Sequence, residues 1–291
     1  MDREKLSIVI VNYNNRQELD VCLYSINKTK GLLDLEIFVY DNNSSDGSQD
    51  MVKAKYPFVN LIANDRNLGL SRVINSSLKK LTGEYILFLD SDTELKSNAL
   101  QNLISFLQGV DDAGIAGPRV YNEDGSMQET TRRFPTFFSG LFGRRAVITR
   151  LFPGNPISRR FLCMENIHAK EPFEVDYISA ACMMMKREVV SKLRAMDEKF
   201  FVYWTDVDWC RRAKNSGYKV FCVPSAKIIH YERYKPWKKK NPKMIMDFHR
   251  GAYIYYRKHN IRWKFSPLHF ICASALAARA SIHLLLNYFK R

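Results

Sequence analysis

The chain has 291 residues, of which 46% are hydrophobic and 26% charged, and this suits one α/β domain of about 230 residues with a C-terminal appendage. Its net charge of +15 is polarised, because residues 1–130 sum to −6 and residues 131–291 to +21. Zinc-finger spacing and RNP signatures are absent from the sequence, which argues against a nucleic-acid partner. The six cysteines lack Cys-x-x-Cys spacing, and the apolar run at Leu6 is too short for a signal peptide, so we expect a cytoplasmic protein.

The first half of the chain alternates between apolar runs and segments of helical pattern. Strands are predicted at residues 6–11, 35–40, 59–63 and 85–89, and helices at residues 18–27, 48–55, 70–81 and 95–107. This alternation predicts an α/β fold whose mostly parallel sheet has helices on both faces. Each strand ends in polar residues, and open α/β sheets bind their ligands at that edge.

Two carboxylates, Asp90 and Asp92, directly follow the fourth apolar run. A helix N-cap at Ser91, Asp92 or Thr93 would also explain these residue types. The loop at residues 12–15 contains no glycine, and neither a dinucleotide-binding glycine motif nor a P-loop occurs. A diphosphate bound at this edge would therefore need a divalent metal held by carboxylates.

A second pair of carboxylates, Asp206 and Asp208, begins a predicted helix that ends near Ser216 and Gly217. Capping by Thr205 or Asp206 is the structural alternative. Capping does not explain the surrounding aromatic residues, which are Phe200, Phe201, Tyr203, Trp204 and Trp209. We expect them to form a wall on which a sugar stacks and which raises the basicity of a carboxylate by excluding water.

Five motifs in this order resemble glycosyltransferase family 2. They are residues 7–14, 41–47, 67–69, 89–92 and 206–212. Within the family, the motifs are most similar to bacterial rhamnosyltransferase-like members. The resemblance implies the GT-A fold and an inverting transfer from a nucleoside-diphosphate sugar, with the family's usual Mg²⁺ or Mn²⁺ as cofactor.

The resemblance also assigns roles on the donor side. Asp41 would hydrogen-bond the nucleobase, with Tyr13 nearby. Asn67 and Gly69 would line the nucleotide-sugar site, and Asp90 would contact the ribose or the sugar. The other carboxylate of the motif at residues 89–92, Asp92, would bind the metal.

The metal and acceptor roles fall on later matches. Asp92 would be a metal ligand, and His230 matches a histidine that reaches the metal or diphosphate in some relatives, although a structural histidine is the alternative. Asp206 matches the general base. The acceptor-side residues would be Ser179, Ala180, Trp204, Thr205 and Asp208. Thr205 replaces the family's usual glutamate, which shortens any acidic contact to the acceptor. Ala180 replaces its usual glycine, so we expect a reshaped acceptor loop.

Residues 268–289 are mostly apolar, but Arg279, His283 and Asn287 recur on one helical face. We expect this helix to lie in a membrane interface, with Leu276, Ile282, Leu285 and Phe289 facing lipid. Packing on the protein's own core is the alternative. The basic stretch at residues 235–243 is either a solvated loop or a contact with an anionic membrane surface, and we favour the membrane.

These features predict a GT-A domain at residues 1–235, with a nucleotide-sugar half (1–120) and an acceptor half (121–235), followed by a basic loop and membrane-associating helices (236–291). Residues 132–172 read as an insertion with a short helix near residues 137–152. The expected activity is transfer from a UDP- or dTDP-linked sugar to a glycan or polyprenyl-linked acceptor, in cell-surface polysaccharide assembly at the inner face of the membrane. The alternatives are a sugar-nucleotide nucleotidyltransferase and a non-catalytic membrane-associated nucleotide-sugar-binding protein.

Overall fold

The computed structural model describes residues 4–136, 149, 151–152, 154–231, 239–261, 263 and 265–290. The short helix predicted near residues 137–152 lies largely outside this described part. Residues 235–238 of the basic stretch at residues 235–243 also lie outside it, whereas residues 239–243 are described.

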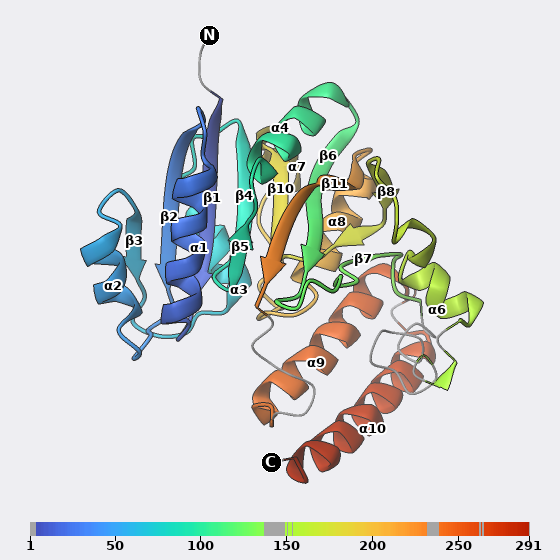
Figure 1. Ribbon diagram of the computed structural model, residues 1–291. Coiled ribbons are helices and arrows are strands. Elements are labelled where there is room, and N and C mark those ends of the chain that lie inside the picture. Colours follow the sequence, from blue (N-terminus) through green and yellow to red (C-terminus); the bar gives the residue numbers. More distant parts are fainter. Residues whose placement is uncertain are drawn as a thin grey trace.

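One mixed sheet forms the centre of the molecule (Figure 1). Its strands are β1 (Lys5–Asn12), β2 (Asp34–Asp41), β3 (Asn60–Ala63), β4 (Tyr85–Asp90), β5 (Thr93–Leu95), β6 (Ala113–Tyr121), β8 (Phe173–Val175), β10 (Cys182–Lys186) and β11 (Lys219–His230). They lie in the order β3-β2-β1-β4-β10-β6-β11-β5, with β8 also beside β11. Neighbours among β1 to β4 are parallel, whereas β10, β5 and β8 run antiparallel to their partners. A separate small sheet pairs β7 (Thr131–Arg132) with β9 (Tyr177–Ile178).

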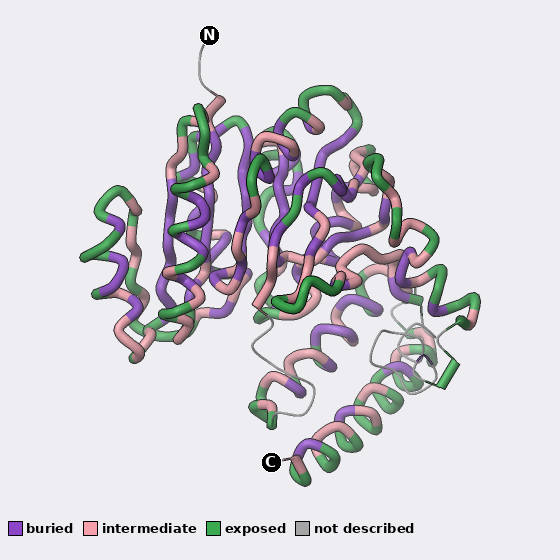
Figure 2. The backbone as a smooth tube through the Cα atoms, viewed as in Figure 1, coloured by how far each residue is buried: buried purple, intermediate pink, exposed green. Residues whose placement is uncertain are grey.

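Helices cover both faces of the large sheet, as the sequence predicts. One face is covered by α1 (Arg16–Thr29), α2 (Ser48–Lys55) and α4 (Ala99–Gly109), and the other by α3 (Leu70–Ser77), α7 (Arg187–Leu193) and α8 (Thr205–Asn215). Successive strand residues point to opposite faces, so Ile8 and Ile10 join one core cluster and Val9 the other. Figure 2 shows the resulting buried strands between exposed helix surfaces.

The C-terminal helices α9 (Pro242–His259) and α10 (Leu268–Tyr288) pack against each other. In Figure 1 they lie below the carboxyl ends of β6 and β11. Ala252 and Tyr255 of α9 are buried in the same core cluster as Trp209 of α8. The first of the two C-terminal helices is therefore part of the core, and only the second has a largely exposed surface. Two further short helices, α6 (Pro156–Phe161) and η2 (Met164–Asn166), lie between β7 and β8 in the chain.

The helix expected at residues 95–107 begins four residues later, at Ala99. Residues 93–95 instead form β5, because β11 offers them an antiparallel edge, with His230 opposite Thr93. Local pattern could not reveal this partner, which is more than 130 positions away in the chain. The pairing has a functional consequence, since it brings the end of β11 beside Asp92.

Candidate active site

The parallel register gathers polar residues at one edge of the sheet. Asn12 at the end of β1 lies opposite Asp41 at the end of β2, and Val11 lies opposite Asp90 at the end of β4. Asp41 is buried, and its carboxylate accepts hydrogen bonds from Asn12 Nδ2 (2.8 Å), Ser44 N (2.8 Å) and Gln49 Nε2 (2.8 Å). This buried carboxylate therefore holds the loop after β2 in shape. The side chain of Tyr13, in the loop after β1, is 48% exposed.

The loop before α3 is joined to the segment before α8. Gly69 has a φ of +77°, and a Cβ added there would lie 2.5 Å from the Phe201 ring and 2.6 Å from its carbonyl oxygen. That same carbonyl accepts a hydrogen bond from Leu70 N at 2.6 Å. Asn67 is exposed, and its Oδ1 accepts from Gly69 N at 3.0 Å. Only glycine fits this close to Phe201. The glycine of the motif at residues 67–69 is therefore required by the packing of the loop.

Asp90, Asp92 and His230 form a cluster of possible metal ligands. One ligand atom from each lies within 4.8 Å of the others, and His230 Nε2 is 3.3 Å from Asp92 Oδ1. Burial raises the pKa of Asp90, the charge of Asp92 raises it further, and His230 opposes this. Two partly buried carboxylates side by side are costly without a cation. Carboxylate oxygens with one imidazole nitrogen form a donor set that suits Mn²⁺ or Mg²⁺, so the residues present fit a divalent metal.

Asp206 lies in the first turn of α8 and faces the same region as the cluster. Its Oδ1 accepts a hydrogen bond from Val207 N at 2.9 Å, and the Ala180 N–H also donates to the carboxylate. Burial raises the pKa of Asp206, while these hydrogen bonds and the charge of Arg132 oppose the rise. The result is a carboxylate that is more basic than an ordinary aspartate.

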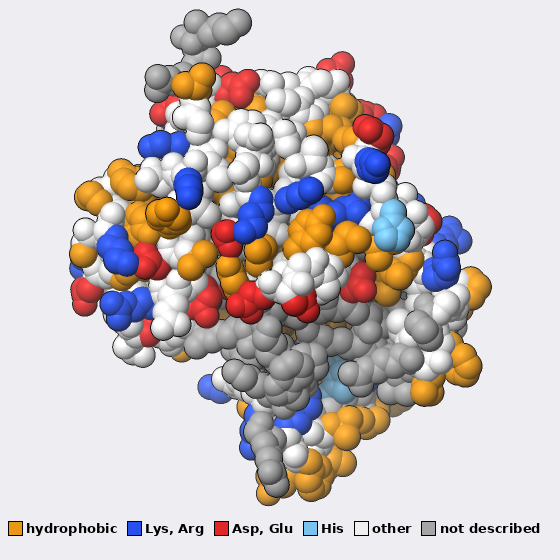
Figure 3. Space-filling model, in the orientation of Figure 1, with side chains coloured by type: hydrophobic (Ala, Val, Ile, Leu, Met, Phe, Trp, Pro, Cys, Tyr) orange, Lys and Arg blue, Asp and Glu red, His pale blue; other side chains and the backbone are white. Residues whose placement is uncertain are grey.

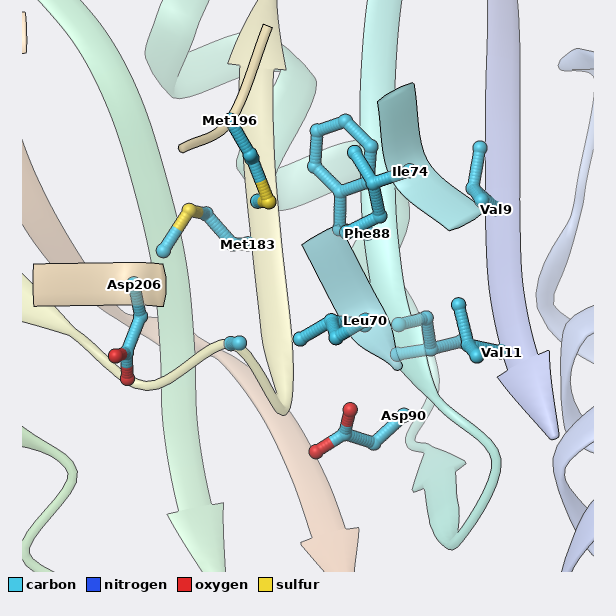
Figure 4. A pocket seen from close by; sticks show the side chains of 11 residues that line it. Val9, Val11, Leu70, Ile74, Phe88, Asp90, Met183, Met196 and Asp206 are labelled. Atoms are coloured by element: carbon cyan, nitrogen blue, oxygen red, sulfur yellow. The ribbon is translucent and has the colours of Figure 1, made fainter. Parts of the chain in front are cut away.

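One pocket joins the two predicted carboxylate motifs. It is lined by Asp90, Asp206 and Ala180, with apolar residues such as Leu70 and Met183 forming the rest of its wall. In Figure 4 both carboxylates lie at the same end of the pocket, beyond the apolar side chains. Carboxylates 116 positions apart in the chain therefore converge on one cavity.

The loop with the predicted acceptor-side residues 179 and 180 is tied to the strand that ends at Asp90. Asp90 N donates to the Ala181 carbonyl at 3.0 Å, and Ala181 N donates to Ser179 Oγ at 3.3 Å. Ala180 is not among the residues with positive φ, so alanine fits here without the strain that the family's glycine suggests. Thr205 is buried, and its hydroxyl donates to the Val202 carbonyl at 3.1 Å.

The predicted aromatic wall is wrong for most of its members. Phe200 and Trp209 are fully buried in the core, where Trp209 contacts Phe88 with ring centroids 5.0 Å apart. Trp204 packs against Phe248 of α9, to whose carbonyl its indole Nε1 donates at 2.9 Å. The sequence shows aromatic residues near a carboxylate, but it does not show that α9 would cover them. Of this set, Phe201 alone is exposed, at 43%.

Asp208 points to α9 and not to the pocket. It is buried, and its Oδ1 lies 2.7 Å from His259 Nε2 and 2.8 Å from Lys258 Nζ. Burial opposes ionisation, but the hydrogen bonds from His259 and Lys258 hold the pKa of Asp208 below its usual value. The sequence did not predict the contact of Lys258 and His259 with Asp208, because only the tertiary fold brings α9 to α8.

Comparisons with known proteins agree with this architecture. The family model "Glycosyl transferase family 2" matches residues 7–194. The N-acetylglucosaminyl-diphospho-decaprenol L-rhamnosyltransferase of Mycobacterium tuberculosis is 24% identical over 288 residues, which cover 95% of this chain and 92% of the relative. The dTDP-rhamnosyl transferase RfbF of Shigella flexneri is 26% identical over 200 residues, or 67% of this chain and 59% of the relative.

Solved structures share the fold. GalNAc-T7 with UDP, GalNAc and Mn²⁺ superposes with a TM-score of 0.63 at 19% identity, covering 87% of this chain and 48% of that one. The mannosyltransferase PcManGT from Pyrobaculum calidifontis, with GDP-Man and Mn²⁺, gives a TM-score of 0.59 at 17% identity, covering 98% and 71%. These matches confirm the predicted GT-A fold. Since the family model spans well over half of the chain, the protein belongs to glycosyltransferase family 2 and is a glycosyltransferase that resembles bacterial rhamnosyltransferases.

Proposed function

We propose that the enzyme transfers a rhamnosyl residue from a dTDP-linked donor to a hydroxyl of a saccharide carried on a polyprenyl diphosphate, with inversion at the anomeric carbon. The donor and acceptor follow from the names of the relatives, of which the mycobacterial one aligns over nearly all of both chains. The single observation that carries the chemistry is the pocket shared by Asp90 and Asp206.

In this mechanism Asp206 accepts the proton of the attacking hydroxyl. The bond from the acceptor oxygen to the anomeric carbon forms on one face of the sugar, while the bond to the diphosphate oxygen breaks on the other. A positioned base of this kind contributes a factor of roughly 10² to 10⁴ to the rate. A divalent cation held by Asp90, Asp92 and His230 would stabilise the negative charge of the departing diphosphate.

Helix α10 supports a contact with the membrane surface. Two of its polar residues turn inward: Asn287 is buried, with Oδ1 accepting from Lys240 N at 2.8 Å, and His283 contacts His249 of α9 with ring centroids 5.1 Å apart. The exposed hydrophobic side chains of α10 and of the segments at its two ends are Trp263, Phe265, Leu268, Phe270, Ile271, Ile282, Leu285, Leu286, Tyr288 and Phe289. Figure 3 shows hydrophobic side chains along this lower edge with basic ones beside them.

An inverted helix of this kind, polar toward the protein and apolar outward, suits a lipid environment. Lys239, near Tyr288, and Lys290 at the helix end add the positive charge that anionic headgroups attract. By length and composition α10 is also one helix that could cross a membrane. We favour the interface, because one side of the helix is occupied by α9. One expectation is corrected: Leu276 does not face outward but packs against the core.

The test is a transfer assay with purified enzyme, a panel of dTDP- and UDP-linked sugars, and a polyprenyl-diphosphate-linked saccharide. Product formed only with dTDP-rhamnose supports the proposal, whereas transfer from UDP-hexoses alone overturns the donor assignment. A nucleotidyltransferase would instead form a nucleotide-sugar from a sugar phosphate and a nucleoside triphosphate. Loss of transfer in Asp206→Asn would count against a non-catalytic binding protein.

A further inference from the structure

We infer that Gln128 is a positioning residue that fixes the tautomer of His230, so that the Nε2 lone pair faces the proposed cation. This inference rests on the proposed function, because it requires a metal at Asp90, Asp92 and His230. It concerns a residue outside all the motifs that the sequence analysis singled out. Gln128 lies just beyond β6 and is buried.

The hydrogen bonds around Gln128 determine the direction of its side-chain amide. Gln128 Nε2 donates to Asn122 Oδ1 at 2.7 Å and to the His230 carbonyl at 2.9 Å. Asn122 is oriented in turn, since its Nδ2 donates to Ser126 Oγ at 2.8 Å. Both amide hydrogens of Gln128 are thus directed at acceptors, and a flipped amide would put its oxygen against two other acceptor oxygens.

The remaining polar atom of Gln128 is therefore an acceptor, and it meets the histidine. Gln128 Oε1 lies 3.1 Å from His230 Nδ1. A carbonyl oxygen has no proton to give, so the proton in this hydrogen bond belongs to Nδ1. In the neutral imidazole this makes Nε2 the unprotonated nitrogen, and an unprotonated nitrogen is what binds a metal.

The other side of the ring fits this assignment. Nε2 lies 3.3 Å from Asp92 Oδ1. Two adjacent ligands of one cation, each at about 2.1 Å and at right angles, lie about 3 Å apart. Two acceptors at this separation need a cation or a proton between them. The imidazole is thus held between a protein acceptor at Nδ1 and a metal-binding carboxylate at Nε2.

The backbone keeps Gln128 in place. Its N–H donates to the Val120 carbonyl at 2.9 Å, next to the bridge between Tyr121 and Met127. The tight turn that closes this hairpin has Gly125 at a φ of +81°. Because Tyr121 also pairs with Ile229 of β11, the hairpin and the histidine are anchored to the same two strands. The geometry therefore does not depend on an exposed, isolated side chain.

Binding of Mn²⁺ alone to the full chain tests this inference, by titration calorimetry and by the electron paramagnetic resonance signal of free Mn²⁺. Gln128→Leu removes the acceptor at similar size, and loss of an outer partner of this kind typically weakens metal binding 10- to 100-fold. Gln101→Leu is the matched control, because it removes a glutamine whose side chain donates to the Thr29 carbonyl in another part of the molecule. We expect that control to bind Mn²⁺ as the wild type does.

A double-mutant cycle separates positioning from a merely structural role. If Gln128 acts through His230, then Gln128→Leu has no further effect on Mn²⁺ affinity in a His230→Ala background. Nitrogen-15 NMR of labelled histidines gives a second measurement on the metal-free protein. In the metal-free protein, where a proton takes the place of the cation between Nε2 and Asp92, Nδ1 of His230 should also carry a proton in the wild type and should lose it in Gln128→Leu.

The possible failures are distinguishable. Unchanged Mn²⁺ affinity and unchanged protonation of Nδ1 in Gln128→Leu, in a wild type that binds Mn²⁺, would overturn the role of Gln128 and leave the metal site standing. Equal weakening in both His230 backgrounds would show a general structural effect and would also overturn it. A wild type that binds no Mn²⁺ would overturn both this inference and the proposed metal, while sugar transfer by Asp206 could still be measured.

Discussion

Asp206 combines three properties that a general base requires: a place in the pocket, a hydrogen-bonded orientation and a raised pKa. Asp208, two residues later, has the opposite environment, with cationic partners and a lowered pKa. The chain thus places two similar carboxylates in different environments, one as the proposed base in the pocket and the other as a structural group. This difference comes from the neighbours of each side chain and not from the residue type.

Replacing Asp206 with asparagine keeps the size of the side chain but removes the base. We expect kcat to fall by roughly 10² to 10⁴, with little change in affinity for the nucleotide-sugar. Transfer rates and donor binding by calorimetry measure the two effects. Asp65→Asn, at an exposed position, should behave like the wild type. An Asp206→Asn enzyme with near-normal kcat would remove this residue from the mechanism.

The fall of kcat/KM at acidic pH should follow the protonation of Asp206. Because that pKa is raised, the base becomes protonated, and kcat/KM falls, at a higher pH than the usual aspartate value of about 3.9. The charge of Arg132 favours the ionised form, so Arg132→Gln should move this fall to still higher pH. Arg133→Gln is the control, since its guanidinium pairs weakly with Glu165 and Asp176, both at 3.9 Å. A fall that moves to lower pH in Arg132→Gln would contradict the assignment.

At the scale of elements, the loop before α3 depends on one glycine. Gly69→Ala would place a methyl group against the Phe201 ring and carbonyl, in a backbone region that glycine alone occupies readily. We expect a stability loss of about 1–3 kcal/mol or more, together with a raised KM for the donor. Gly125→Ala is the matched control, because its φ is also positive but a Cβ there meets nothing within 4 Å. Equal urea midpoints for the two variants would show that contact with Phe201 is unimportant.

The link between α8 and α9 is a buried charge network around Asp208. Removing one partner of such a network typically lowers the free energy of unfolding by about 3–5 kcal/mol. We expect a smaller loss here, because the Lys258 side chain is one-third exposed. The lowered pKa means that this stability is present above about pH 3.9 and is lost as the pH falls through the folded-state value. Asp208→Asn should therefore be destabilised at pH 7 and have a flatter acid dependence. Asp197→Asn, whose carboxylate also meets Lys258 at 3.1 Å but is more exposed, should lose less in urea unfolding.

The local hydrophobic pattern was sufficient to predict the helices and strands of the parallel part of the sheet. Residues 48–55 form the predicted helix, and the ends of β1, β2 and β4 lie at one edge as expected. Pattern failed where distant segments decide the outcome. Residues 93–95 became a strand because β11 pairs with them, and the aromatic residues near Asp206 were covered by α9. Gln128 was missed for the same reason, since its role depends on a residue 102 positions away.

At the scale of the whole molecule, the pocket and the C-terminal helices lie at the same end of the sheet. The carboxyl end of β4 supplies Asp90, and α9 contacts Trp204, the N-cap residue of α8, two positions before Asp206. An enzyme whose acceptor carries a polyprenyl chain needs its catalytic pocket near the bilayer. In the function we propose, the outward apolar face of α10 would provide that proximity, and the excess of positive charge after residue 130 would act in the same direction.

Deleting the whole C-terminal region would not test this contact cleanly, because α9 shares the core with α8. Substitution of exposed α10 residues is sharper. Phe270, Leu285 and Phe289 are 78%, 60% and 74% exposed, so Phe270→Ser, Leu285→Ser and Phe289→Ser together should leave the fold intact. We expect the triple variant to lose most of its cosedimentation with vesicles that contain anionic lipid, because each apolar side chain buried in lipid contributes about 1.5–3 kcal/mol.

Transfer to a water-soluble acceptor should remain unchanged in the triple variant, while transfer to a polyprenyl-linked acceptor in vesicles should fall. Leu32→Ser, at an exposed position between α1 and β2, is the control for loss of surface hydrophobicity alone. High salt should weaken vesicle binding of the wild type by screening the basic residues, and it should leave the apolar contribution. Full vesicle binding by the triple variant would show that α10 is not the membrane contact, and the basic residues alone would then have to account for it.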